Sequence, residues 1–312
     1  MRQMKKIIIG FVLMLTTISS YSQQDAQFTQ YMYNTININP AYAGSRGTMS
    51  IFALHRTQWV GLDGAPVTNA ASINTPINES NVGLGVSIVN DRIGPSSENN
   101  IAVDLSYSIQ TSERYKLSFG LKATANLLDV DFTQLKMLNP GDYSFENNID
   151  NKFSPNVGVG FYLHSDNTYF GLSAPHLLET THYDRYAGSG SKSHISKENI
   201  NLYFIAGHVF DLSYNVKFKP SLLTKYVAGA PLQVDLSANV MFNEKFVAGL
   251  AYRWSASMSA MVGFQASESW FIGYAYDMET TRLENYNSGS HEIILRYELF
   301  KNYNKMVSPR FF

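Results

Sequence analysis

Histidine is the side chain in this sequence best suited to metal binding or acid–base chemistry, and the chain has seven of them. His291 begins the run His-Glu-Ile-Ile-Leu, which starts like a zinc-protease motif but lacks the second histidine. The run also falls where apolar and polar residues alternate, which is typical of a strand and not of a zinc-binding helix. We therefore do not expect zinc at His291.

A second group of candidates shares one polar stretch, residues 176–198. Imidazole and carboxylate groups are metal ligands, so a metal site in this stretch stays an open alternative. Solvated loop residues are the simpler interpretation, and the sequence does not identify a ligand. The five side chains are His176, Glu179, His182, Asp184 and His194.

Other catalytic signatures are missing from the sequence. Cysteine is absent, which excludes disulfides, thiolate metal sites and a cysteine nucleophile. The chain has no G-x-S-x-G, P-loop or G-x-G-x-x-G motif. The pairs Gly83/Gly85 and Gly158/Gly160 are better explained as strand glycines that relieve crowding in a barrel. We expect a protein that is not an enzyme and holds no cofactor.

Composition indicates an exported protein with little need for a charged surface. Charged residues make up 16% of the chain, against roughly 25% in soluble domains, and Tyr and Phe number 20 and 19. The formal charge is −1, which does not resemble a nucleic-acid-binding protein. The lack of cysteine suits a periplasmic route, where stray thiols would be oxidised.

Residues 1–22 have the features of a secretory signal peptide. Basic residues precede the apolar stretch 7–15, and Ser20-Tyr21-Ser22 fits a small-x-small cleavage site. The apolar stretch is well short of the ~20 residues that a bilayer-spanning helix needs. We expect this segment to be removed on export.

From Thr48 onward the sequence alternates apolar and polar residues with a period of two, which indicates strands. Several of these segments have about ten residues, the length that crosses an outer membrane when tilted. No segment shows a convincing helical period. Fourteen strands are predicted: 48–58, 66–76, 81–91, 99–110, 115–128, 154–164, 168–175, 199–210, 214–226, 231–242, 246–255, 257–267, 270–279 and 290–300.

The connections are sorted by length. If the first strand begins in the periplasm, every second connection is short, as at 165–167 and 243–245, and the others include the long stretches 129–153, 176–198 and 280–289. Short periplasmic turns and long external loops are the outer-membrane arrangement. Strand backbones in lipid must all be paired, so the sheet must close. The sequence therefore predicts an all-β fold, a multi-pass transmembrane antiparallel β-barrel of about fourteen strands in the cell outer membrane, over residues 48–300.

The alternation also predicts which side chains face lipid and which face the lumen. Ile293, Leu295, Tyr297 and Leu299 are expected to face lipid. Aromatic residues beside the short turns are expected to form an interfacial girdle. The lumen charges form either an internal salt-bridged network or a ligand site, and both interpretations stay open. The girdle candidates are Tyr115, Tyr162, Tyr169, Phe210, Tyr214, Phe242, Phe246 and Trp270, and the candidate lumen charges are Asp104, Lys122, Asp235, Arg253 and Arg296.

Residues 23–47 precede the first strand and are rich in aromatic and apolar side chains. A disordered periplasmic arm, which is the alternative, would be poor in aromatics and rich in charge. We predict a plug that packs in the periplasmic half of the barrel, narrows the lumen and is displaced when a partner binds. Asn39-Pro40 is expected to turn the chain so that Gly44 leads into the first strand. The candidate plug residues are Phe28, Tyr31, Tyr33, Asn39, Pro40, Tyr42 and Gly44.

Several segments, in order over nearly the whole mature chain, resemble the PorP/SprF family of the Bacteroidota type IX secretion system. The most specific are QDAQFTQYMYN (24–34) and NINPAYAGSRG (37–47). The other similar segments are RTQWVGLDGAP (56–66), VGLGVSIVNDRIGP (82–95), YFGLSAPHLLE (169–179), GYAYDM (273–278), GSHEI (289–293) and SPRFF (308–312).

The resemblance implies a barrel related to the long-chain fatty-acid transporters, with an N-terminal plug. It implies export or surface anchoring of a cognate secreted protein that carries a type B C-terminal signal domain, often an adhesin linked to gliding. It also implies contact with the type IX secretion machinery, including its periplasmic components, and it supplies no catalytic residues.

A channel for small hydrophobic solutes is the alternative function. The inward-facing positions are mainly Gly, Ser, Asn and charged residues, which disfavours a pocket for an acyl chain. The C-terminal tail 301–312, which ends in Phe311 and Phe312, is expected to contact the periplasmic mouth of the barrel or a periplasmic partner.

Overall fold

We describe the protein from a computed structural model, which covers residues 27–77, 80–135, 148–178, 181–186, 192–197 and 200–299. The expected signal peptide (1–22) and C-terminal tail (301–312) lie outside these residues, so both remain predictions. Across the described ranges, no helix has the length and apolar character needed to cross a membrane.

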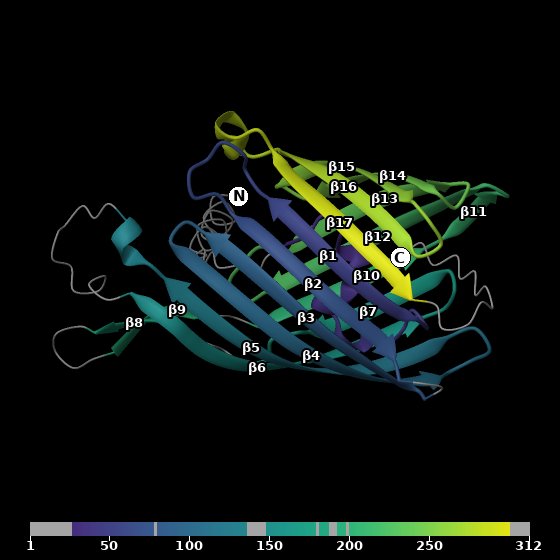
Figure 1. Ribbon diagram of the computed structural model, residues 1–312, viewed down its shortest axis with the longest axis horizontal. Helices are drawn as coiled ribbons and strands as arrows, with labels where there is room; N and C mark the ends of the chain where they lie inside the picture. Colours follow the sequence, from purple (N-terminus) through teal and green to yellow (C-terminus); the bar gives the residue numbers. More distant parts are fainter. Residues whose placement is uncertain are drawn as a thin grey trace, which may run out of the picture.

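One antiparallel sheet closes on itself to form a barrel (Figure 1). The first strand, β1 (Met49–Thr57), pairs along its length with the last, β17 (Ser290–Leu299). The circuit is completed where β10 (Asn201–His208) pairs with β12 (Val216–Val227). β11 (Phe210–Ser213) continues the register of β10 along β12, so the two occupy one of fourteen strand positions.

The other strands of the barrel follow one another around the circuit in sequence order. A separate two-stranded hairpin, β8 (Thr181–Tyr186) and β9 (Lys192–Lys197), lies in the connection between β7 and β10. The remaining barrel strands are β2 (Val67–Pro76), β3 (Val82–Ile93), β4 (Ser96–Gln110), β5 (Lys116–Val130), β6 (Ile149–His164), β7 (Thr168–Ala174), β13 (Gln233–Phe242), β14 (Phe246–Arg253), β15 (Ser257–Gln265) and β16 (Trp270–Glu279).

The predicted strands and the closed fourteen-stranded barrel are confirmed. The strand ends differ most at the long-loop end, where β4 begins at Ser96 instead of 99 and β6 begins at Ile149 instead of 154. These added residues are mostly polar on both faces, because they extend beyond the apolar band, and so they carry no alternation signal. β3 and β4 are consequently joined by the tight turn Gly94-Pro95.

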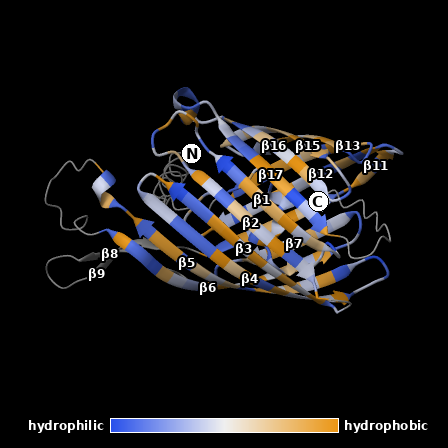
Figure 2. Cartoon of the chain, viewed as in Figure 1, coloured by the Kyte–Doolittle hydropathy of each residue, from blue (hydrophilic) through white to orange (hydrophobic). Residues whose placement is uncertain are grey.

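The outer face of the barrel is apolar, as the bands of hydrophobic colour across the strands in Figure 2 illustrate. On β17, Ile293, Leu295 and Leu299 are exposed, whereas Tyr297 is half-buried against Trp270, with ring centroids 4.7 Å apart. An outer face of exposed aliphatic side chains requires lipid around it. The four side chains therefore point outward, as the alternation predicts.

The predicted aromatic girdle is partly wrong. Phe210, Phe242 and Phe246 are exposed on the outer face near the short-turn end, but Tyr162 and Tyr169 are each 2% exposed and lie in the lumen. Each tyrosine is two residues from an inward-facing glycine of its own strand, and residues two apart face the same side. Closeness to a turn does not show which side that is. Their rings fill the lumen and pack 6.1 Å apart, centroid to centroid.

Candidate functional site

The lumen contains the chain's own residues 28–43. They form three short 3-10 turns, η1 (Tyr31–Tyr33), η2 (Thr35–Asn37) and η3 (Pro40–Tyr42), whose side chains are nearly all buried. The short turns and the intervening residues place many polar backbone groups in the lumen, and lumen side chains bond several of them. We call residues 28–43 the lumen segment.

The lumen segment runs along the barrel axis. Gln27 bonds Gln233, which begins β13 at the external, long-loop end of the barrel. At the other end Arg46 forms an ion pair with Glu298 near the periplasmic end of β17. The segment was expected to pack only in the periplasmic half, and that expectation was wrong: it also reaches the external half. The sequence contains no signal for this path, because it depends on contacts with distant strands.

Asn39 and Pro40 form the turn that the sequence indicates. The Asn39 side-chain oxygen accepts a hydrogen bond from the Ala41 N–H (3.0 Å), which caps η3, and its amide nitrogen donates to the Phe161 carbonyl (2.9 Å). Pro40 occupies the first position of η3, where its missing N–H costs nothing. Asn39 is fully buried and therefore joins the turn directly to the wall at β6.

Inward-facing glycines provide the space for this turn. A Cβ on Gly120 would lie 2.1 Å from the Ala41 nitrogen, and one on Gly160 would lie 2.1 Å from the Asn39 side-chain oxygen. No side chain fits at either position without moving the lumen segment. A Cβ on Gly171 would lie 2.8 Å from the Asn39 side chain, and one on Gly273 would lie 2.6 Å from the Gln30 side chain. We call the other four glycines that contact the segment in this way the glycine cradle: Gly83, Gly85, Gly120 and Gly160.

The remaining candidate plug residues also lie in or beside the lumen. Tyr33 stacks on Phe271 with ring centroids 5.0 Å apart, and Tyr42 meets Tyr162 edge-on at 5.5 Å. Gly44 adopts a φ of 69°, and a Cβ there would approach the Gly83 Cα to 2.8 Å. Gly44 is therefore required both by its backbone conformation and by its contact. Phe28 and Tyr31 are buried in the same apolar cluster.

Four of the five predicted lumen charges are buried and Arg253 is half-buried, but the five do not form one cluster. Asp104 and Lys122 pair at 2.9 Å, and the Lys122 ammonium also donates to the Ile36 carbonyl (3.3 Å). Asp235 and Arg253 pair at 2.9 Å in a different part of the wall. The pairs are thus local, and one of them holds the lumen segment directly.

Arg296 lies apart from both pairs, at the periplasmic side of the lumen. Its guanidinium lies over the Tyr33 and Phe271 rings, 5.7 Å and 5.1 Å from their centroids, and 3.5 Å from Glu298. Arg46 bonds the same carboxylate. The structure therefore brings Arg296 together with Glu298 and the lumen segment, and not with the other four predicted charges.

A further polar site in the lumen was not predicted from the sequence. Arg56 of β1, Asp277 of β16 and Glu292 of β17 meet in the lumen, with Arg56 Nη1 2.6 Å from Asp277 and 3.1 Å from Glu292. We call these three residues the charged clasp. One signal was available, because Glu292 shares the strand phase of Arg296, which was assigned to the lumen.

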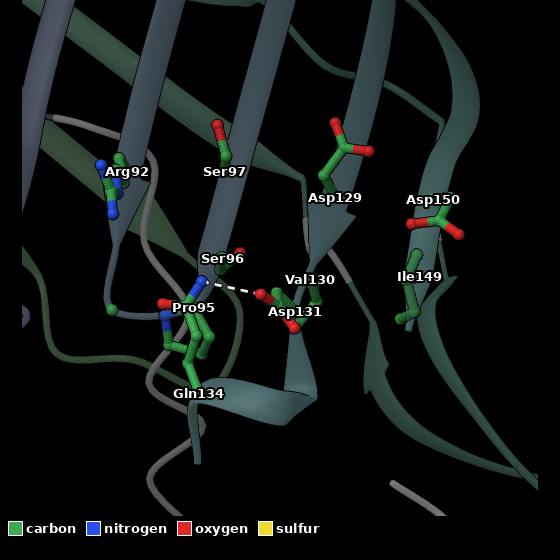
Figure 3. A pocket seen from close by; sticks show the side chains of 11 residues that line it. Arg92, Pro95, Ser96, Ser97, Asp129, Val130, Asp131, Gln134, Ile149 and Asp150 are labelled. Carbon is green, nitrogen blue, oxygen red and sulfur yellow. Dashed lines mark hydrogen bonds between the residues drawn. The ribbon is translucent and has the colours of Figure 1, made fainter. Parts of the chain in front are cut away.

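A pocket of about 290 Å³ opens at the external rim between the ends of β3, β4, β5 and β6 (Figure 3). Hydrogen bonds from Thr133 and Gln134 lower the pKa of the Asp131 carboxyl. Asp129 accepts a hydrogen bond from the Asn151 N–H (2.8 Å). Both carboxylates thus stabilise their own loop, and the pocket offers no separate chemistry.

The histidines whose side chains the structure describes are not gathered into a metal site. Within the described ranges, no three His, Cys, Asp or Glu side chains are placed to hold a metal ion. His291 lies in strand β17, and its ring bonds the Tyr274 hydroxyl at 2.6 Å. Much of the 176–198 stretch lies outside the described residues, so a ligand there is untested.

A closed antiparallel barrel with an apolar outer face defines an outer-membrane β-barrel protein. The family model described as "Type IX secretion system membrane protein PorP/SprF" matches residues 20–297, and the chain belongs to that family. It is therefore an outer-membrane barrel of the type IX secretion system.

Solved structures with a similar fold are channels and porins. The CymD monoaromatic hydrocarbon channel is 13% identical, with a TM-score of 0.49, over 87% of this chain and 92% of that one. A TodX monoaromatic hydrocarbon channel mutant gives 10% identity and a TM-score of 0.49 over 90% and 96%. A Pseudomonas aeruginosa FadL homologue is 12% identical, with a TM-score of 0.43, over 81% of this chain and 89% of that one. These likenesses concern the fold alone. No curated protein matches the sequence.

Proposed function

We propose that this barrel assists the export or surface anchoring, or both, of a cognate secreted protein with a type B C-terminal signal domain, such as an adhesin used in gliding. It does so as a non-enzymatic component in contact with the type IX machinery, including its periplasmic components. Membership of the PorP/SprF family supports a role within the type IX secretion system. The filled lumen supports a role that does not depend on an open pore.

The observation that carries the proposal is the lumen segment. Its backbone is bonded by side chains from opposite parts of the wall: Ser106 of β4 donates to the Ala43 carbonyl (2.7 Å), and Ser173 of β7 to the Ile38 carbonyl (2.7 Å). Glu292 of β17 accepts from the Thr29 and Gln30 N–H groups. A lumen filled in this way suits a barrel whose partner is a protein.

The channel alternative is not favoured. The buried wall of the lumen mixes Ser, Asn and charged residues with apolar side chains such as Ile205 and Phe271. These apolar side chains pack in one cluster with the lumen segment, which occupies the surface that an acyl chain or aromatic solute would need. The resemblance to hydrocarbon channels lies in the fold alone and does not carry their ligands to this chain.

We assign the chain as a signal peptide (1–22), a plug (23–47), the barrel (48–300) and a tail (301–312) that contacts the periplasmic mouth or a periplasmic partner. The plug is displaced when the partner protein binds. The aromatic residues and the polar contacts of the lumen segment keep it seated until then.

A strain that lacks this chain tests the proposed function. We expect the cognate protein to disappear from the cell surface and to return when the full-length chain is restored. A pull-down from a detergent extract with mass spectrometry should recover that protein and type IX components. Unchanged surface proteins in the deletion strain would overturn the proposal.

A disulfide lock tests plug displacement separately. The Ser72 hydroxyl donates to the Asn34 side chain at 3.0 Å, so Asn34→Cys with Ser72→Cys places two thiols together in a chain that has no other cysteine. We expect oxidation to reduce secretion several-fold and reduction to restore it. The control pair, Ser72→Cys with Ser87→Cys, links the facing residues of β2 and β3 and leaves the plug free. Equal secretion by both oxidised pairs would contradict displacement.

A further inference from the structure

The charged clasp is a built site in the lumen wall. Arg56, Asp277 and Glu292 come from three neighbouring strands, and their side chains are 0 to 3% exposed. Two carboxylates face one guanidinium, so the three side chains carry a net negative charge. A buried charge without compensation is strongly unfavourable, so the clasp needs further hydrogen-bond donors.

Two residues of the lumen segment supply those donors. The Thr29 and Gln30 N–H groups donate to the two oxygens of Glu292, at 3.0 and 2.9 Å. The Thr29 hydroxyl donates to Asp277 (2.6 Å) and accepts from Arg56 Nη1 (3.1 Å). The Gln30 side chain takes no part in these bonds. Consecutive backbone N–H groups and one hydroxyl are therefore the groups that the clasp bonds, and many peptides present them when they form a turn, as Thr29 and Gln30 do.

Part of the clasp remains unused. Arg56 Nε has no hydrogen-bond partner among the described residues, although its side chain is 3% exposed. The present occupant thus leaves one buried donor of the clasp unsatisfied. A wall that served only to seat the plug could do so with steric contacts, as the glycine cradle does.

Thr29 and Gln30 are also the part of the lumen segment that can leave most easily. They lie at its N-terminal end, whereas Asn39 and Ala41 are enclosed by the glycine cradle. Releasing the two residues breaks their polar contacts and moves the adjoining buried Phe28, but it does not require the turn at Asn39-Pro40 to move. Asp277 and Glu292 would keep their ion pairs with Arg56 but lose the donors that Thr29 and Gln30 supply, in the external half of the lumen.

We propose that the charged clasp is a peptide-binding site that the chain's own Thr29–Gln30 occupies until a turn-forming segment of the partner protein replaces them. The segment it accepts has a Ser or Thr followed by a residue with a free N–H, so proline is excluded at the second position. This inference rests on the proposed function, in which a protein partner displaces the plug.

Peptide binding by the purified full-length barrel in detergent tests this site. The probe is a fluorescent synthetic peptide with the sequence of residues 24–34. In the variant Thr29→Ala/Gln30→Pro, the chain's own hydroxyl and one N–H are removed, and the three clasp residues are unchanged. Gln30 has a φ of −94°, not far from the value proline requires. We expect the variant to bind the peptide at least tenfold more tightly than the wild type.

Altered peptides test the recognition on one and the same barrel variant, so folding of the barrel does not affect the comparison. A peptide with Thr29→Ala and an N-methyl group at Gln30 should bind at least tenfold more weakly, and a polyalanine peptide that keeps only the threonine should still bind. The barrel control is Asn34→Ala, which loses the bond to Ser72 but keeps the clasp occupied and should bind like the wild type.

Equal affinity of the wild type and the Thr29→Ala/Gln30→Pro variant would overturn the proposal, as would equal binding of the N-methylated peptide. The assay contains no secretion machinery. If the peptide does not bind but the deletion strain and the pull-down give the expected results, only the peptide site is contradicted. If the peptide binds but the deletion strain shows no secretion defect, the proposed function is contradicted.

Discussion

The two ends of the lumen segment are held in different ways. Around Asn39 and Ala41 the wall has glycines, and the segment fits so closely that one added carbon would collide with it. Around Thr29 and Gln30 the wall has three charged side chains, and the segment is held by hydrogen bonds to its backbone and one hydroxyl. The cradle recognises the shape of one sequence, whereas the clasp recognises groups that many peptides share.

This difference indicates which end is permanent and which can be exchanged. The close packing of the lumen segment against the cradle is lost as soon as the two separate, and a segment of different shape would not fit there in the same way. Hydrogen bonds to a carboxylate can be made by any suitably placed N–H. We therefore propose that the cradle anchors the plug and that a partner competes with the plug at the clasp.

Removal of the clasp cation should have the largest effect. Arg56→Met leaves Asp277 and Glu292 buried together without a cation, and the loss of one partner of a buried ion pair costs about 3–5 kcal/mol. Urea unfolding in detergent should show a much lower midpoint. The control Arg282→Met, at an exposed loop position, should leave the midpoint unchanged. A loss below ~1 kcal/mol would show that the clasp charges are not isolated from water.

A methyl group in the cradle should have the next largest effect. Gly120→Ala forces a carbon against the Ala41 backbone, and overpacking of this kind costs about 1–3 kcal/mol. We also expect faster proteolysis at Tyr31 and Tyr33, because the segment no longer seats. Ala123→Val, which adds volume on the outer face of the same strand, should leave both tyrosines protected. Protection in Gly120→Ala would contradict the role of the cradle.

Loss of the cap on the turn should cost less. Asn39→Ala removes the acceptor for the Ala41 N–H and the donor to the Phe161 carbonyl, and loss of a cap costs about 0.5–2 kcal/mol. Thr281→Ala removes the equivalent cap from an exposed external turn and should lower the unfolding midpoint less. Equal losses for the two variants would indicate that the contact with β6 adds nothing.

The smallest effect should come from pH at the external rim. The folded-state pKa of Asp131 is lowered, so its stabilisation of the loop is complete above the carboxyl's unfolded value and is lost as pH falls through the folded value. Amide exchange of Thr133 should therefore be slow at neutral pH and faster near pH ~3, after correction for intrinsic rates. Asp131→Asn should abolish this pH dependence of Thr133 exchange. If the pH dependence persists in that variant, another group is responsible for it.

Most of the barrel could be predicted from the sequence, because lipid outside and polar lumen inside impose the period of two on every strand. The same rule gave Asp104, Lys122 and Arg296 their inward positions. It could not give the partners, since the pairing of Arg56 with Asp277 depends on the stagger of strands far apart in the sequence. Tyr162 and Tyr169 were predicted to face outward because they lie close to a short turn. The alternation along their strands, which places them in the lumen, was not taken into account.

The central claim is that the chain's own N-terminal residues close the lumen, and electrical recording from the purified full-length protein in planar bilayers tests it most directly. We expect no large, steady single-channel currents from the wild type, and frequent openings from Gly120→Ala, in which the segment cannot seat. Large, steady currents from the wild type would show that the lumen is open, because a filled lumen cannot conduct like an open pore.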